Sequence, residues 1–248
     1  MARGNARHPA HLWERAAMAG ADHVAGDHRN LSEIGHERLR RDLLNGSFFP
    51  GDKLALDALA ERYGIGAVPL REALNRLTSE GLVERIGQRG FFVAPISIDG
   101  LEDLVQTRIW LETRALAESI RNATPEWEEG LVLALHRLVR TQRALASLGG
   151  EGTTEEWEER HRAFHMMLLE RCGSSWLMGF CAQMMDQSIR YRNLSMVRAD
   201  NATRREGAAE EHQVILDAVL DHDAPRACAL LEEHYRTTLG VLRRVFEV

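Results

Sequence analysis

The stretch that decides the fold is "GIGAVPLREALNRLTSEGLVERIGQRGFFV", residues 64–93. Pro69 fits the first turn of a helix, where its missing N–H costs little. Apolar residues then recur at helical spacing until Gly81 ends the run: Leu70, Ala73, Leu74 and Leu77. Residues 82–96 next predict two short strands around a Gly-Gln-Arg-Gly turn. A turn, a helix and a hairpin therefore follow one another without a gap.

Two further helices precede this stretch. The first is predicted from the stripe Ile34, Leu39, Leu43 and Leu44, which Asn45-Gly46 ends. A Pro50-Gly51 turn leads to a short second helix through Leu56, Leu59 and Ala60. Three helices and a hairpin predict a winged helix-turn-helix, which we place at residues 30–96. Residues 1–29 show no sustained apolar period and are expected to form a flexible N-terminal tail, with a short helix near Leu12-Trp13.

The remainder, residues 97–248, is predicted to be helical throughout. Gly, Pro, Asn and Asp punctuate it, as at Thr124-Pro125 and Gly149-Gly150. The expected helices span 99–122, 125–147, 153–171, 175–199, 203–221 and 224–246. Amphipathic helices of this length suit an antiparallel six-helix bundle. The fold class is therefore mainly α, with an N-terminal winged helix-turn-helix and a C-terminal bundle.

Length and composition limit the function. The 248 residues suit two modest domains, and the apolar content of 44% can fill their cores. No apolar run approaches the roughly 20 residues of a membrane helix, and the N-terminus lacks the apolar core of a signal peptide. The three cysteines, Cys172, Cys181 and Cys228, have no metal-type spacing. We therefore expect reduced thiols, a cytoplasmic protein and no membrane partner.

Charge divides unevenly along the chain. Of the 31 basic and 37 acidic residues, 13 and 12 fall within residues 1–96, whereas 18 and 25 fall within 97–248. The less acidic half is the better candidate for contact with phosphates. All the basic residues except Lys53 are Arg, which suits bidentate contacts to phosphate and guanine, although genome base composition explains the bias equally well.

Residues 39–97 resemble the N-terminal domain of GntR-type bacterial transcription regulators. The marks are Asn45-Gly46, Pro50-Gly51, Leu54, Leu59-Ala60, Arg71-Glu72-Ala73-Leu74, Leu77, Glu80-Gly81-Leu82-Val83 and Arg89-Gly90. The helical half resembles the FadR-like branch with its FCD effector domain, through Arg108, Glu112, Phe164-His165, Glu211-His212 and Glu233-His234. The resemblance implies a homodimeric DNA-binding repressor whose operator affinity responds to a small metabolite, and it implies no enzyme activity.

Carried onto this chain, the resemblance places the DNA contacts at the start of the recognition helix and at the wing tip. Arg71 is expected to contact phosphate or guanine. Gly66, Ala67 and Val68 replace the usual Ser/Thr-Arg-Thr; their backbone N–H groups can still hold a phosphate, and a methyl group can face thymine. Gln88, Arg89 and Gly90 form the wing tip. The alternative for Arg71 is a bracing ion pair with Glu80 or Glu84.

The candidate metal ligands are His161, His165, His212 and His234. The first two are spaced i, i+4 and share one helix face, and the other two lie on the last two helices. Four imidazoles can thus converge on Zn²⁺, Ni²⁺ or a similar divalent metal. In many FCD domains the position of His161 holds Asp. The alternatives are a histidine pocket that binds the effector without metal, and a site whose metal is itself the effector.

Arg108 and Arg190 are the candidate effector-binding residues. Arg108 matches an Arg that lies beside the effector pocket in the related domains, where a small carboxylate would be its partner. The alternatives are an ion pair of Arg108 with Glu112 and a solvated face for Arg190. The "PLREAL" form of the recognition helix resembles that of regulators of glutarate and related dicarboxylate catabolism. A di-iron enzyme is disfavoured because the bundle holds a single Glu-x-x-His, Glu158 to His161.

Overall fold

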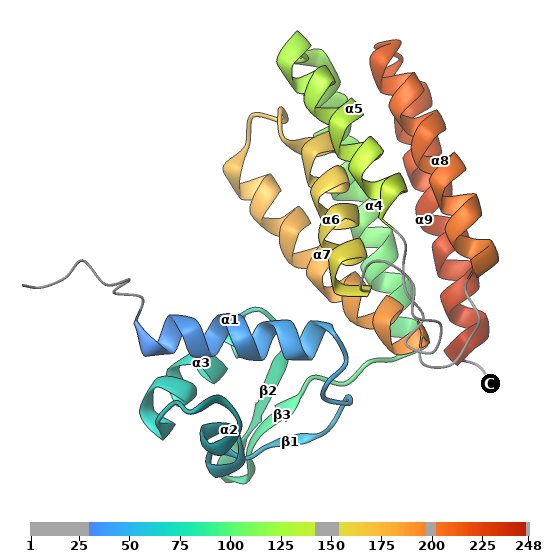
Figure 1. Cartoon of the computed structure of the whole chain (residues 1–248). Helices are drawn as coiled ribbons and strands as arrows, with labels where there is room; N and C mark the ends of the chain where they lie inside the picture. Colours follow the sequence, from blue (N-terminus) through green and yellow to red (C-terminus); the bar gives the residue numbers. More distant parts are fainter. Residues whose placement is uncertain (1–29, 142–153, 197–201, 247–248) are drawn as a thin grey trace, which may run out of the picture. The chain divides into compact units, whose positions relative to one another are not determined.

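Helices α1, α2 and α3 and a small sheet form the N-terminal part of the chain, here called the winged domain (Figure 1). The computed structural model describes residues 30–141, 154–196 and 202–246. The three helices span Leu31–Leu44, Leu56–Tyr63 and Ala67–Ser79. The predicted tail, residues 1–29, lies outside the described residues. The winged helix-turn-helix expected from the sequence is confirmed.

The sheet of the winged domain is antiparallel, with strand order β1-β3-β2. Strands β2 (Val83–Ile86) and β3 (Gly90–Val93) are the predicted hairpin, joined by a 3₁₀ turn at Gly87–Arg89. Gly90 has a φ of 103°, which a residue with a Cβ rarely adopts, and this glycine allows the chain to turn back at the wing tip. The two-residue strand β1 (Lys53–Leu54) pairs with β3 and was not predicted.

The core of the winged domain contains the leucines that the sequence marked. Leu39, Leu70, Leu74 and Leu77 are fully buried. The left-handed Gly64 (φ 65°) ends α2, and the extended Gly66 begins α3 two residues later. The short turn between them fixes the angle of α3, whose apolar side packs on α1 and whose other side is exposed.

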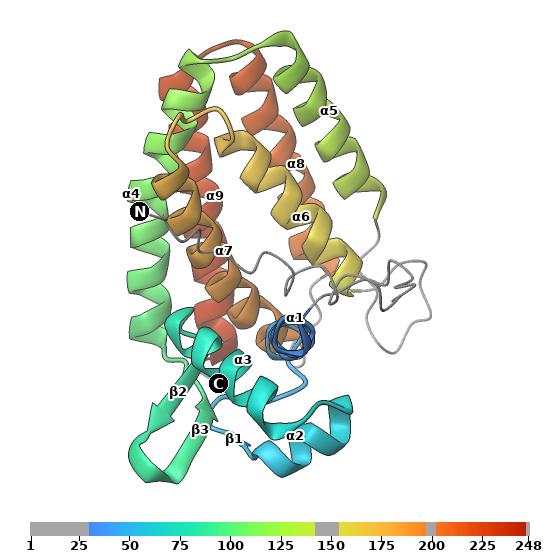
Figure 2. The ribbon, with the colours of Figure 1, turned by 90° about the vertical axis from the view of Figure 1, so that its left-hand side faces the viewer.

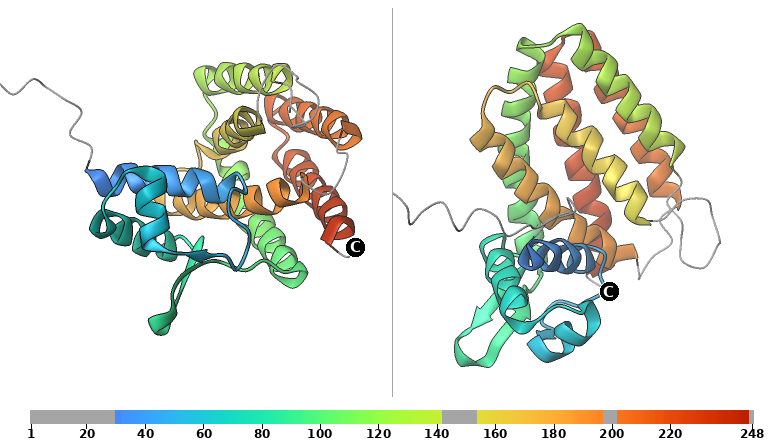
Figure 3. Two further views of the ribbon diagram at one scale, coloured as in Figure 1. Left: turned by 60° about the horizontal axis from the view of Figure 1, so that its bottom comes forward. Right: turned by 60° about the vertical axis from the view of Figure 1, so that its left-hand side comes forward.

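Helices α4 to α9, here called the helical domain, run side by side as a bundle (Figures 2 and 3). Their bounds are Ile98–Arg121, Pro125–Arg140, Thr154–Leu169, Ser175–Met196, Ala202–Leu220 and Ala224–Phe246. Ser97 and Thr124 cap α4 and α5 by accepting hydrogen bonds from Gly100 N and Trp127 N. The six predicted helices are present, and the predicted ends at 142–147 and 197–199 lie outside the described residues.

The bundle buries one continuous apolar core. Phe164, Leu131, Leu168 and Leu231 are completely inaccessible to solvent. Helix α4 packs on α9, α7 and α6, and α8 packs on α9 and α5. Because α6, α8 and α9 all present residues to the same interior, side chains from distant parts of the sequence meet there.

Candidate functional site

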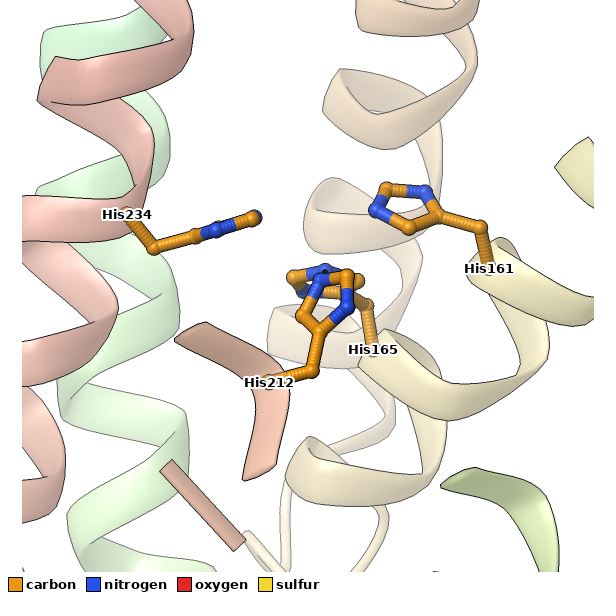
Figure 4. Close-up of side chains that lie close together, drawn as sticks. All are labelled: His161, His165, His212 and His234. Carbon is orange, nitrogen blue, oxygen red and sulfur yellow. Dashed lines mark hydrogen bonds between the residues drawn. The ribbon is translucent and has the colours of Figure 1, made fainter. Parts of the chain in front are cut away.

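Four histidines from three helices meet inside the helical domain, and Figure 4 shows their rings turned toward one another. His161 and His165 come from α6, His212 from α8 and His234 from α9. One ring nitrogen from each lies within 4.8 Å of the corresponding atoms of the others. None of the four is more than 4% exposed. The structure therefore brings together all four predicted metal ligands; we call them the imidazole cluster.

Burial keeps the α6 histidines neutral. It lowers the pKa of His161 and of His165 well below 6.5, and the neighbouring imidazoles lower both further. His161 also stacks on Trp157, with ring centroids 4.6 Å apart. Its Nδ1 atom is buried and has no hydrogen-bond partner among the described residues. A buried ring nitrogen without a partner is uncommon and is well suited to a ligand that the protein itself does not supply.

Hydrogen bonds behind the cluster fix which ring nitrogens face its centre. The Tyr235 hydroxyl donates to Glu112 Oε2, so it accepts from His165 Nδ1 at 3.1 Å. Burial raises the pKa of Tyr235 well above 10, which keeps this hydroxyl protonated. His234 Nδ1 donates to Glu211 Oε2 at 2.6 Å. His165 and His234 thus both direct the lone pair of Nε2 inward.

This arrangement fits a divalent metal. His165 Nε2 and His212 Nε2 lie 3.1 Å apart, so two potential donor atoms already converge. Metal-binding histidines usually donate the other ring N–H to a carboxylate or another oxygen, as His165 and His234 do here. A set made only of imidazoles suits Zn²⁺, Ni²⁺ or Cu²⁺ and does not suit Mg²⁺ or Ca²⁺.

Arg108 lies next to the cluster and already has an anionic partner. Its Nε and Nη2 donate to the two oxygens of Glu112 at 2.7 and 3.3 Å, and Nη1 donates to Ser188 at 3.1 Å. Although burial opposes it, the Glu112 carboxylate raises the pKa of Arg108. The ion pair that the sequence offered as the alternative is therefore present, and it is buried. Glu112 and Tyr235 connect Arg108 to His165.

Arg190 is not part of this network. Its guanidinium donates to the carbonyl oxygen of Ala94 and to Gln187 Oε1, and it is only 3% exposed. Burial lowers its pKa. The structure thus places Arg190 against the end of strand β3, and neither beside the imidazole cluster nor on a solvated face as the sequence had suggested.

The predicted DNA-contacting residues of α3 lie on its exposed side. Gly66 is the N-cap and offers no side-chain cap, so the first N–H groups of the helix, including those of Ala67 and Val68, are open. Val68 is 73% exposed. Within the described residues Arg71 forms no ion pair, and Glu80 is paired instead with His36 and Arg40. The bracing role proposed as the alternative for Arg71 is not observed.

The wing tip is exposed as well. Gln88 and Arg89 lie in the 3₁₀ turn between β2 and β3, followed by the half-buried Gly90. The Arg89 guanidinium lies 5.6 Å from the centre of the Phe92 ring, which supports the side chain from one side. These residues are separate from the imidazole cluster and form a second candidate surface together with the start of α3.

Three residues with candidate roles were missed. Asn75 is exposed one turn after Arg71 on the same side of α3, and its i, i+4 spacing from Arg71 was a usable signal. Tyr235 and Glu211 are the hydrogen-bond partners of cluster histidines. Each precedes or follows a ligand in the sequence, but a residue adjacent on a helix points in another direction, so the spacing gave no indication of these contacts.

Among the described helices, none combines the length and the apolar character that crossing a bilayer requires.

Comparison with known proteins agrees with the fold over most of the described chain. Residues 34–93 match the model of bacterial regulatory proteins of the gntR family, and residues 103–237 match the FCD domain. The uncharacterized HTH-type transcriptional regulator BphR of Paraburkholderia xenovorans LB400 is 36% identical over 220 residues, covering 87% of this chain and 86% of BphR. The HTH-type transcriptional repressor GlaR of Escherichia coli K12 is 32% identical over 211 residues, covering 85% of this chain and 94% of GlaR.

Solved structures share the fold. E. coli McbR/YncC superposes with a TM-score of 0.73 at 24% identity, covering 87% of this chain and 98% of that one. A GntR transcriptional regulator from Rhodococcus sp. RHA1 superposes with a TM-score of 0.68 at 17% identity, covering 85% of this chain and 96% of that one. The relatives and the fold are those of transcription regulators and not of enzymes. The chain belongs to the GntR family of bacterial transcription regulators and carries an FCD domain.

Proposed function

We propose that this regulator is a cytoplasmic repressor whose affinity for operator DNA is changed by a small carboxylate metabolite bound in the helical domain through a divalent metal. The DNA-binding domain spans residues 30–96, and the effector-binding and dimerisation domain spans 97–248. The imidazole cluster is the observation that carries the proposal. Its four buried histidines, two of them oriented by Tyr235 and Glu211, form a ready set of nitrogen ligands.

Charge favours an anionic effector. Arg108 and Glu112 neutralise each other, and the α6 histidines are uncharged, so a bound Zn²⁺ or Ni²⁺ supplies net positive charge in a buried place. A carboxylate is the simplest small anion that can both coordinate such an ion and compensate its charge. Arg108 reaches His165 only through Glu112 and Tyr235, so the positive charge offered to an effector comes from the metal.

On the DNA side, Arg71 is the residue we propose to contact phosphate or guanine, because it is exposed and has no competing ion pair with any residue that the structure describes. The open N–H groups at Gly66, Ala67 and Val68 suit a phosphate. Gln88, Arg89 and Gly90 are placed to approach the adjacent groove or backbone. Few side chains at 66–68 can read bases, so the operator should differ from that of relatives with Ser-Arg-Thr.

We propose a homodimer on two half-sites about one helical turn, roughly 10 bp, apart. Exposed aromatic side chains on α4 and α7, two helices that pack together, offer apolar surface for a second copy: Trp110 is 66% exposed, Trp176 79% and Phe180 50%. Repression is proposed because the relative GlaR bears the name of a transcriptional repressor.

The test is a binding titration with a matched histidine control. A DNA duplex selected from a random library by the wild-type protein is titrated in EDTA, in Zn²⁺ or Ni²⁺, and in metal plus a panel of small carboxylates that includes glutarate. We expect the metal and an acid together to change the duplex affinity. His165→Ala should abolish the response, and His136→Ala, which alters an exposed histidine on α5, should preserve it. Equal responses of the two variants would refute the proposal.

A second candidate function is a metal sensor proper. The ligand count favours it, since four protein nitrogens complete the tetrahedral set that is typical of closed zinc sites. A four-coordinate ion would then have no open coordination position for a carboxylate. A six-coordinate Ni²⁺ bound by the same four histidines would have two open positions. If the metal alone changes duplex affinity and no acid adds to the effect, the sensor function is correct.

A further inference from the structure

Four side chains on one side of α7 donate hydrogen bonds to backbone carbonyls of the winged domain. Their positions, spaced by three or four residues, place them along one helix face. The pairs are Gln183 with Glu80 O at 3.4 Å, Gln187 with Glu80 O at 2.9 Å, Arg190 with Ala94 O, and Asn193 with Leu44 O at 2.8 Å. All these donors belong to α7, so this helix links the helical domain directly to the winged domain.

The accepting carbonyls lie at the ends of three elements. Leu44 is the last residue of α1, Glu80 is the C-cap of α3, and Ala94 follows the end of β3. The last carbonyls of a helix have no partner within it and must be satisfied from outside. The α7 side chains supply those partners. They thereby hold the C-terminal end of the recognition helix α3 and the end of strand β3 in place against α7.

The opposite side of α7 contacts the surroundings of the imidazole cluster. Ser188 accepts from Arg108 Nη1 at 3.1 Å, and Arg192 donates to Glu158 Oε2 at 2.7 Å. Glu158 lies on α6, three residues before the cluster ligand His161, and is 3% exposed. A shift of α6 or of Arg108 would therefore reach α7 through these buried contacts, which resist breaking because an unpaired buried charge is costly.

The contact between α7 and the winged domain is mainly polar. Ile189, 4% exposed, is the α7 residue that joins the apolar core of the winged domain. A cavity of about 520 Å³, lined largely by charged residues of α1, α6 and α7, lies beside it. A second of about 500 Å³ lies between α7 and the end of α3. Arg40 and Arg162 both pair with Asp186 at this contact. The apolar part of this contact is therefore small, and most of the contact is made by polar and charged groups beside cavities.

We propose that α7 couples the imidazole cluster to the DNA-binding surface, with Gln187, Arg190 and Asn193 as positioning residues. The inference rests on the proposed function and specifies its regulation. Binding of the metal and the effector at the imidazole cluster displaces α6 and Arg108. Helix α7 moves with them because Ser188 and Arg192 contact them. The ends of α3 and β3 then move because they are hydrogen-bonded to α7 side chains. The linkage between ligand and DNA then depends on these hydrogen bonds and not on the covalent linker alone.

The test combines two substitutions on α7 with a matched amide control. Gln187→Ala/Asn193→Ala removes two of the four donors, including the one that makes the shorter hydrogen bond to Glu80 O. Gln213→Ala removes an exposed amide of α8 that donates a hydrogen bond to Asp217 in the same helix. Each protein is assayed for zinc affinity against a chelating dye, and for affinity to the selected duplex in EDTA, in Zn²⁺, and in Zn²⁺ with glutarate. Hydrogen exchange of residues 40–46 and 76–97 is followed with and without Zn²⁺.

We expect the α7 variant to bind zinc with the affinity of the wild type. Its affinity for the duplex, however, should change less than twofold when Zn²⁺, or Zn²⁺ with glutarate, is added. The zinc-dependent change in exchange at 40–46 and 76–97 should disappear, whereas Gln213→Ala should keep both responses. If the α7 variant keeps the wild-type fold-change, the inference is overturned and the proposed function stands. If loading leaves the wild-type duplex affinity unchanged, the proposed function fails and the inference fails with it.

A variant that does not fold is replaced by Gln187→Glu, which keeps the size of the side chain and replaces the donor NH₂ by an acceptor oxygen facing Glu80 O. The same two outcomes apply to it: a lost response with retained zinc affinity supports the role of α7, and a wild-type response overturns it.

Discussion

The pH dependence of stability is the sharpest consequence of the imidazole cluster in the metal-free protein. Burial lowers the pKa of His161 and of His165 well below 6.5 in the folded protein. In the unfolded chain both side chains have the ordinary histidine pKa of about 6.5. As the pH falls through this value, the unfolded chain binds protons that the folded chain does not bind. Stability therefore falls as the pH falls, starting near pH 6.5 and continuing until the folded rings are protonated.

The magnitude follows from linkage. Between pH 6 and pH 5, each ring that stays neutral in the folded state lowers the free energy of unfolding by about 1.2 kcal/mol, so the two together contribute about 2.4 kcal/mol, or roughly a 60-fold change in the unfolding constant. Urea denaturation in EDTA, followed by far-UV circular dichroism at pH 5, 6 and 7, measures it. Other groups titrate as well, so the informative quantity is the difference between wild type and variant.

His161→Gln/His165→Gln removes both titrating rings and should remove about 2.4 kcal/mol of the loss between pH 6 and pH 5. His136→Gln, at an exposed position on α5, should leave the wild-type dependence unchanged. If the double variant and the wild type lose equal stability over this interval, the two α6 histidines are not buried and neutral in solution. The ligand set assigned to the metal would then be wrong.

Three further predictions address the other parts of the molecule. Arg71→Ala should weaken duplex binding by about 1–3 kcal/mol at moderate salt with unchanged circular dichroism, whereas Arg114→Ala on the bundle should not; unchanged binding in a gel shift would exclude the DNA contact. Tyr235→Phe should lower zinc affinity by about 10- to 100-fold in a dye competition, since His165 Nδ1 loses its acceptor; equal affinity would show that the hydroxyl does not orient the ring. Leu131→Ala, at a fully buried core position, should cost about 2–5 kcal/mol in urea denaturation, and a cost below 1 kcal/mol would mean that the core collapses around it.

The sequence predicted the elements well where its local signals were strong. Thr124-Pro125 begins α5 where predicted, because a cap and a proline at the first position act within one turn. The pairing of His161 with His165 followed from their spacing on one helix face. Strand β1 was missed since two residues are too few to produce an alternating pattern, and its only support is the ladder with β3.

Contacts between helices were the part that the sequence could not supply. Arg190 was expected near a ligand or in solvent, because a lone Arg on an amphipathic helix gives no indication of a carbonyl on another domain. Its partner, Ala94, is 96 residues away. In the same way, the proximity of Glu112 to Tyr235 depends on the packing of α4 on α9. Such polar contacts follow from tertiary packing and not from spacing.

The replacement of an expected Asp by His161 changes the charge balance of the whole site. With Asp as a ligand, a divalent metal would be half neutralised by the protein; with four imidazoles it keeps its full charge of +2. At an effective dielectric of about 20, a unit charge 4 Å away interacts with another by about 4 kcal/mol, so an incoming carboxylate gains more here than at a site with Asp. Glu211 is hydrogen-bonded directly to a cluster histidine, His234, and Glu112 is already paired with Arg108. Replacing His161 by Asp should therefore raise affinity for the metal alone and weaken the dependence of metal binding on an added carboxylate, which a dye competition with and without glutarate would measure. An unchanged dependence would mean that the carboxylate does not bind near the metal.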